Sequence, residues 1–208
     1  MKNTDIMLTL KEEQGVQSRR HILEAALDLM AQRGYAGASI SAISKQSGLP
    51  VSSIYWHFES KEGLLAAVLE DGARNFVDGL PKFEKLKGSH RERVGLLMRD
   101  LARRLGSQPR FLRLLILMGL EHRHSDSAVL ENIRSIRRQT IEGSARSIAN
   151  TILAGHPEKD EFARKLATLL LVIADGAFIA HQIDPNFNLE ELFELQFQAL
   201  AAMLPPDR

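Results

Sequence analysis

Cysteine is absent from this chain of 208 residues, which excludes a disulfide framework and any metal site with cysteine ligands. The N-terminal stretch MKNTDIMLTLKEEQG lacks the basic start and the following apolar run of a signal peptide. The longest apolar stretch, residues 166–180, is interrupted by Asp175 and is too short to span a bilayer. We therefore expect a cytoplasmic protein that makes no contact with a membrane.

Acidic side chains are also missing between Asp28 and Glu59, although the chain as a whole is balanced at 27 Lys plus Arg and 26 Asp plus Glu. The same part of the chain holds six serines between Ser39 and Ser53. A surface without carboxylates and with many hydroxyl donors suits a phosphate backbone, because like-charge repulsion is removed and neutral donors can reach phosphate oxygens. This local distribution of charge indicates a nucleic-acid contact, which the net charge does not.

Residues 39–58, SISAISKQSGLPVSSIYWHF, are typical of two short helices joined by a tight turn. Ser39 is a good N-cap and is followed by apolar residues at helical spacing. Gly48 stands where a helix ends in the left-handed conformation. Pro50 cannot continue the first helix but can begin a second one. The stretch therefore predicts a helix-turn-helix.

The second of these helices is predicted to turn Ile54 and Phe58 inward, since they lie four residues apart. Tyr55 and Trp56 then lie on the outer side, where a soluble helix rarely leaves aromatic residues without a partner. The alternative is that both are core aromatics of a small helical hairpin. The missing carboxylates and the serines favour a DNA-binding surface.

Position in the motif predicts two kinds of DNA contact. The side chains expected to bind phosphates are Ser39, Tyr55, His57 and Lys61. Those expected to face base edges are Val51, Ser52, Ser53 and Trp56. Ser41, Lys45 and Pro50 complete the predicted DNA-binding surface.

The hydrophobic pattern predicts helices throughout the rest of the chain. It shows no strand-like alternation, and the sequence contains no repeats or low-complexity tracts. Residues 1–15 are predicted to be a mobile arm, and a helix is expected from Ser18 to Arg33, ended by Gly34. A further helix begins at Ser60 and stops at Gly79. Later helices are expected at about 91–105, 110–122, 128–153, 158–183 and 189–204. The apolar content of 44% is enough for a substantial core.

The N-terminal part resembles the TetR family of one-component bacterial transcriptional regulators. The resemblance covers about residues 17–76, and the later part agrees only in length and helical pattern. It is carried by Ile22 to Met30, Gly34-Tyr35, Ser39, Gly48-Leu49-Pro50, Ile54-Tyr55-Trp56-His57-Phe58 and Ser60-Lys61-Glu62. There are departures: Pro50 replaces a frequent serine, Val51 a common Lys, Arg or Gln, and Ser41 a frequent Arg. These departures affect the residues expected to contact base edges, not the residues expected to position the protein on the DNA.

The resemblance implies an all-α fold of about nine helices, with an N-terminal three-helix bundle followed by a larger helical domain for ligand binding and dimerisation. The domains expected are an arm at 1–15, a DNA-binding domain with its connecting helix at 16–76, and a C-terminal domain at 77–208. The implied effector pocket is lined by Met98, Phe111, Leu114, Leu117, Met118 and Phe178. The implied dimer interface contains Phe162, Leu166, Leu170, Ile173, Ala177, Phe193, Phe197 and Leu200.

Other polar clusters predict less. Two histidines in the segment Glu121, His122, His124, Asp126 are two residues apart and point to different sides of a helix, so we expect no metal there and no cofactor elsewhere. Arg103-Arg104 and Arg137-Arg138 read as exposed helix faces. Asp175 requires a partner, either at the dimer interface or on a ligand.

We therefore expect a homodimeric repressor that binds a palindromic double-stranded operator and is released by a small, mostly apolar ligand. A DNA-binding protein without a ligand is the main alternative. A helical enzyme that uses a C-terminal cavity is disfavoured, because the sequence contains no nucleophile and base pair, metal set or phosphate loop.

Overall fold

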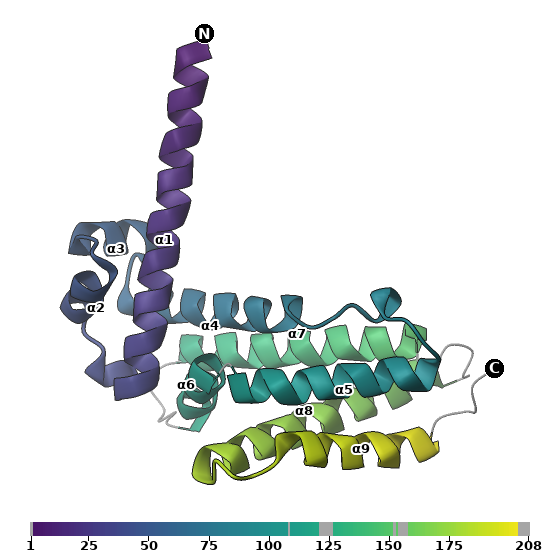
Figure 1. Ribbon diagram of the computed structural model, residues 1–208. Coiled ribbons are helices and arrows are strands. Elements are labelled where there is room, and N and C mark those ends of the chain that lie inside the picture. The colour runs from purple at the N-terminus through teal and green to yellow at the C-terminus, as the bar shows by residue number, and fades with distance from the viewer. Residues whose placement is uncertain (1, 108, 121–126, 152, 154–157, 204–208) are drawn as a thin grey trace. The chain divides into compact units, whose positions relative to one another are not determined.

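The computed structural model describes residues 2–107, 109–120, 127–151, 153 and 158–203, and these residues form helices without any strand (Figure 1). The elements are α1 (Lys2–Gly37), α2 (Ile40–Ser47), α3 (Val51–Phe58), α4 (Lys61–Asp78), the 3-10 helix η1 (Phe83–Lys85), α5 (His90–Ser107), α6 (Pro109–Leu120), α7 (Ser127–Thr151), α8 (Lys159–Ile183) and α9 (Leu189–Met203). The predicted all-α fold is confirmed, and the ends of α5 to α9 lie within two residues of the predicted ones.

The first helix differs from the prediction at its start. α1 already includes residues 12–17, whereas the sequence predicted an arm followed by a helix from Ser18. The predicted start is wrong because Glu12, Glu13 and Gln14 are good helix formers, and a single Gly15 inside a helix costs only about 1 kcal/mol. The predicted end is confirmed as an interruption, since Gly34 has the non-helical angles φ 73° and ψ 166°, and the last residues of α1, 35–37, follow this kink.

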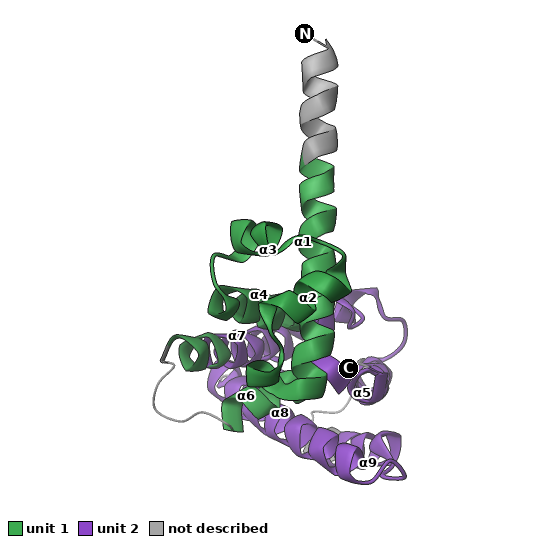
Figure 2. Ribbon diagram, turned by 90° about the vertical axis from the view of Figure 1, so that its left-hand side faces the viewer, with its two compact units in different colours: residues 1–73, 113–133 green, residues 74–112, 134–208 purple. Residues whose placement is uncertain are grey.

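The chain divides into two compact units (Figure 2). Unit 1 comprises residues 1–73 and 113–133, and unit 2 comprises residues 74–112 and 134–208. The boundaries fall inside α4, α6 and α7, so each of these helices contributes residues to both units. Residues 113–133 group with the N-terminal part in this division, and the predicted domains stay a prediction.

The core of unit 1 joins the first four helices. Its fully buried large side chains include Ile22 and Met30 from α1, Ile43 from α2, Ile54 from α3, and Leu64, Leu65 and Leu69 from α4. Burying a side chain of this size contributes about 1.5–3 kcal/mol. The two short helices therefore depend on α1 and α4 for their stability, because eight residues are too few for a stable isolated helix.

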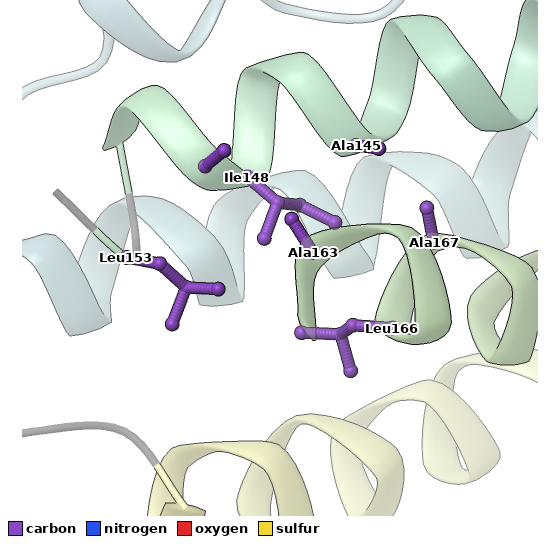
Figure 3. Close-up of a cluster of buried hydrophobic side chains, with 7 residues drawn as sticks. Ala145, Ile148, Leu153, Ala163, Leu166 and Ala167 are labelled. Carbon is purple, nitrogen blue, oxygen red and sulfur yellow. The ribbon is translucent and has the colours of Figure 1, made fainter. Parts of the chain in front are cut away.

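Unit 2 is built on α5, α8 and α9 together with the later part of α7. α5 and α9 lie side by side (Figure 1). Figure 3 shows a second contact, where Ala145 and Ile148 of α7 face Ala163 and Ala167 of α8. Alanines at this contact allow the two helices to approach closely.

α8 is long and apolar enough to cross a membrane by length and composition alone. The helix has 25 residues, which is more than the stretch 166–180 from which the sequence argument excluded a span. A helix in the core of a protein passes the same test, and α8 packs against α7 at the contact in Figure 3. Length and composition therefore do not assign α8 to a membrane.

Two predictions about charged residues of unit 2 are corrected by their contacts. Arg104 is not simply exposed, because its guanidinium donates to the carbonyl oxygens of Asn75 at 2.9 Å and Phe76 at 3.2 Å. It thus satisfies carbonyls in the last turn of α4, where a cation also interacts favourably with the helix dipole. Asp175 pairs with Arg137 of α7 at 2.5 Å within the same chain.

Candidate nucleic-acid interface

The predicted helix start and turn are both present in α2. The amide N–H of Ala42 donates to the hydroxyl of Ser39 at 3.1 Å, which makes Ser39 the N-cap. Gly48 follows the helix with φ 72°, the left-handed conformation that glycine adopts without steric cost. The sequence signals at both ends of α2 therefore act as predicted.

Two of the serines that suggested a phosphate-binding surface are used inside the turn. The hydroxyl of Ser44 donates to the carbonyl oxygen of Leu49 at 2.7 Å, and the N–H of Leu49 donates to Ser47 at 3.4 Å. Both bonds are partly buried. Their physical role is to hold the angle between α2 and α3, whereas Ser39, Ser41 and Ser52 remain exposed.

α3 has one buried and one exposed face. Ile54 and Phe58 are buried, while Trp56 is 76% exposed and Tyr55 48% exposed. The ring of Trp56 lies edge-on to His57, with 4.5 Å between ring centroids. The core alternative is therefore wrong for Tyr55 and Trp56, because both rings lie outside the buried part of unit 1.

The remaining predicted DNA contacts are also accessible. Lys45, Pro50 and Val51 are exposed, and Ser53, His57 and Lys61 are partly exposed. Ser39 is the N-cap of α2, and the other ten predicted residues lie on α2, α3, the turn between them, or the first residue of α4. Their assignment to phosphate or base contacts stays a prediction.

The junction between α3 and α4 is a tight, strained turn. The N–H of Ser60 donates to the carbonyl oxygen of Phe58 at 2.6 Å, and Glu59 between them has φ 63° and ψ −42°. An i to i+2 bond around a residue with positive φ is the rare γ-turn. Gly63 packs so closely that an added Cβ would overlap the Phe58 carbonyl oxygen. The turn sets where α3 lies relative to the start of α4.

Replacing Glu59 with glycine should stabilise the protein. A side chain in the left-handed region costs about 1–2 kcal/mol, and the extra backbone entropy of glycine offsets up to about 1 kcal/mol of that gain. We expect the free energy of unfolding in urea to rise by about 1 kcal/mol. Glu59→Ala is the matched control, because it removes the carboxylate but keeps Cβ. Equal stabilisation by both variants would contradict the backbone explanation.

Lys61, the predicted phosphate contact at the start of α4, is held by residues that sequence reasoning did not assign. Its ammonium lies 4.4 Å from the ring centroid of Tyr35, and partial burial lowers its pKa from the ordinary value. The hydroxyl of Tyr35 donates to the carboxylate of Glu62 at 3.0 Å. The pKa of Glu62 is lowered, chiefly by a hydrogen bond from its own backbone and then by Tyr35. The aromatic ring restricts Lys61 to one region of the surface.

Arg19 is a second contributor that sequence reasoning missed. Its guanidinium carbon lies 5.2 Å from the ring centroid of Phe58, so α1 adds a cation beside α3. Burial, and then the charge of Arg19, lower the pKa of His57 below its usual value. His57 is therefore mainly neutral at pH 7 and can offer a phosphate a neutral N–H. The sequence did contain a signal for this contact: Arg19 lies three residues before the buried Ile22, so both are on the same side of α1.

Most of the predicted effector residues are buried, and they are divided between the two units. Met98, Phe111 and Phe178 are buried in unit 2, Leu114 and Met118 are buried in unit 1, and Leu117 is half-buried. Phe111 lies near Phe76 of the same unit, with 6.5 Å between ring centroids. Whether these side chains contact a ligand stays a prediction.

The predicted dimer residues differ in how much surface they leave exposed. Leu166, Ala177 and Phe193 are buried inside the chain, and Phe193 has no exposed surface to bury against a partner. Phe162, Leu170, Ile173 and Phe197 are half-buried, and the side chain of Leu200 lies outside the described residues. The large apolar side chains that α8 and α9 do expose are Leu169, Val172, Ile179, Ile183 and Leu195. The apolar surface of α8 and α9 is therefore wide enough for two faces, and which of them contacts a second copy stays a prediction.

The segment considered for metal binding, residues 121–126, lies outside the described residues. Within the described ranges, no group of three or more His, Cys, Asp or Glu side chains is arranged to hold a metal ion. For the rest of the chain, the absence of a metal site stays a prediction. The absence of a cofactor also stays a prediction.

Residues 22–68 match the model of a family described as bacterial regulatory proteins, tetR family. A fatty acid metabolism regulator protein of Bacillus subtilis is 27% identical over 115 residues, 55% of this chain and 58% of the relative. The transcriptional regulator AcrR of Shigella flexneri is 36% identical over 59 residues, 28% of this chain and 27% of the relative. The matched part thus spans little more than half of the first relative and about a quarter of the second.

Solved structures show the same fold. The fatty acid degradation regulator FadR from Bacillus halodurans superposes with a TM-score of 0.71 at 20% identity, covering 87% of this chain and 96% of that one. The transcriptional regulator FadR from Bacillus subtilis, in complex with stearoyl-CoA, gives a TM-score of 0.68 at 21% identity, with the same two coverages. At this level of identity the likeness establishes the fold alone.

Proposed function

We propose that this chain, whose residues 22–68 match the tetR family model, is a DNA-binding transcriptional regulator of that family and a homodimeric repressor of a palindromic operator. A small, mostly apolar ligand releases it from the DNA. The observation that carries this proposal is the exposed, carboxylate-free outer face of α3, with Val51, Tyr55 and Trp56 all accessible. Such a face suits the major groove, where apolar side chains contact thymine methyl groups.

Two copies are required because one helix of eight residues reads too few base pairs for useful specificity. α8 supports a face for the second copy. Its exposed Leu169, Val172, Ile179 and Ile183 recur at intervals of three, seven and four residues, and the exposed Gly176 completes the same stripe. Apolar residues alternating at three and four form the seam between paired helices. Gly176 has open space around its Cα, which allows a partner to approach closely.

The experiment that tests the proposal is selection of bound sequences from random duplex DNA by the full chain. We expect an inverted repeat whose half-sites are centred one helical turn apart, about 34–36 Å, or a multiple of that distance. A single unrepeated half-site would refute the dimeric reading, and no enriched sequence would refute specific DNA binding.

A long acyl group is the effector class that we favour. The relatives named for fatty acid metabolism support it, as does the apolar character of Met98, Phe111 and Phe178 inside unit 2. Gln196 of α9 supports one polar anchor, because it is only 8% exposed and neither polar atom of its side chain has a hydrogen-bond partner among the described residues. Leaving such groups unpaired costs about 1–3 kcal/mol, so a ligand that pairs with them binds favourably.

Gln196→Leu should therefore raise stability and weaken the response to the effector. Removing a buried amide without partners should raise the free energy of unfolding by about 1–2 kcal/mol. Gln198→Leu is the control, since Gln198 lies on the exposed side of the same helix. Thermal unfolding with and without stearoyl-CoA measures both effects. A Gln196→Leu variant that is destabilised, or that stearoyl-CoA stabilises as much as the wild type, would contradict this role.

Thermodynamic linkage distinguishes a repressor that responds to an effector from a DNA-binding protein without a ligand. If operator and effector compete through the conformation of the protein, each weakens the affinity for the other by the same factor. A 100-fold preference of the ligand for the released state corresponds to about 2.7 kcal/mol. Calorimetry of stearoyl-CoA with and without bound operator measures that factor, and equal affinities would favour a repressor without this effector.

A further inference from the structure

Unit 2 carries a pocket of about 580 Å³ between the first turns of α5 and the side of α9. Three cationic side chains, Lys87, Arg91 and Arg99, contribute to its lining. Gly95 and Leu96 of α5 and Phe197 of α9 supply apolar surface. The volume lies in the range of small-molecule sites. None of the predicted effector residues lines this pocket.

The positive charge in the pocket is only partly compensated. Arg99 pairs with Glu194 at 3.5 Å. Glu92, the carboxylate in the lining, accepts a hydrogen bond from the N–H of Ser89 at 2.7 Å and so belongs to the capping box of α5. Within the part of the chain that the structure describes, the side chains of Lys87 and Arg91 have no hydrogen bond or ion pair. Two cations therefore remain for an anionic group.

The apolar part of the pocket depends on a glycine. A Cβ added at Gly95 would lie 3.3 Å from Cζ of Phe197, so the aromatic ring rests against the bare backbone of α5. Leu96 beside it is 38% exposed. The apolar lining formed by Gly95, Leu96 and Phe197 therefore adjoins the two free cations. Inorganic phosphate would contact only the cationic side chains of the pocket, and a neutral lipid would contact only its apolar surface.

We propose that this pocket, lined by Lys87, Arg91, Gly95, Leu96 and Phe197, binds a small amphiphilic anion, a carboxylate with an unbranched acyl chain. The planar guanidinium of Arg91 matches a carboxylate in bidentate geometry, and Lys87 adds a point charge. The acyl chain covers Phe197 and Leu96. The site is separate from the effector site proposed above and does not depend on operator binding.

The test is a calorimetric titration of the full chain with decanoate at a concentration below micelle formation. We expect the Lys87→Glu, Arg91→Glu double variant to bind decanoate at least tenfold more weakly than the wild type. Lys82→Glu with Lys85→Glu is the matched control, because it changes the net charge equally at exposed residues outside the pocket. The control should bind like the wild type, and decanol and inorganic phosphate should each bind at least tenfold more weakly than decanoate.

Methyl NMR of leucine-labelled protein locates the bound decanoate. We expect the signals of Leu96 to shift with the titration and those of the buried Leu114 to stay unchanged. Unchanged affinity in the double variant, equally tight binding of decanol or phosphate, or a shift of Leu114 alone would each overturn the proposal. Operator binding by the same samples is a separate readout: a wild type that binds decanoate here but no operator refutes the repressor and leaves this site standing.

Discussion

Val172→Asp should convert the protein into a monomer that binds its operator at least 100-fold more weakly. Val172 is 57% exposed and lies within the stripe formed by Leu169, Val172, Gly176, Ile179 and Ile183 on α8. A carboxylate buried there against a second copy loses its hydration without gaining a partner, which costs several kcal/mol. Each lost 1.4 kcal/mol is a factor of ten in the dimer constant. Sedimentation equilibrium and gel-shift titration measure the two effects.

Val77→Asp is the matched control for this substitution. Val77 is 49% exposed on α4 and lies outside the α8 stripe, so the same change there should leave the dimer intact. Thermal unfolding separates dissociation from misfolding, because an exposed valine contributes little to the core of its own chain. A Val172→Asp protein that remains dimeric would place the interface elsewhere. A monomer with the affinity of the wild type would refute the need for two copies.

Trp56→Ala should remove most of the sequence preference of the protein while leaving its non-specific binding intact. The indole ring is 76% exposed at the outer face of α3, so its removal costs little stability. A side chain that reads a base edge contributes about 1–3 kcal/mol of discrimination. We expect the ratio of operator to scrambled-DNA affinity to fall about tenfold to 100-fold. Gel shifts at several salt concentrations with both DNAs measure it.

Lys61→Ala provides the complementary comparison. Loss of a phosphate contact should weaken binding to both DNAs alike and lower the salt dependence by about one phosphate. Lys61→Arg keeps the positive charge beside Tyr35 and should therefore keep the salt dependence of DNA binding. If Trp56→Ala weakened both DNAs equally, or Lys61→Ala left the slope unchanged, the two assignments would be wrong.

Local signals made the helices and the turn predictable. Ser39 bonds to the N–H of Ala42 and Gly48 adopts φ 72° because a cap and a left-handed residue act within a few residues of chain. The alternation of buried Ile54 and Phe58 with exposed Trp56 likewise follows from helical periodicity. The sequence by itself therefore determined the all-α fold, the helix-turn-helix and the outer face of α3.

Contacts between distant residues were decided only by the tertiary structure. Sequence spacing does not indicate that Arg104 bonds to carbonyls of α4, that Asp175 pairs with Arg137, or that Tyr35 lies beside Lys61. It also did not distinguish Phe193, which is fully buried, from Ile183, which is 79% exposed, since both are apolar residues of amphipathic helices. Periodicity defines which residues share a face, but the neighbour that covers that face is chosen by packing across the whole unit.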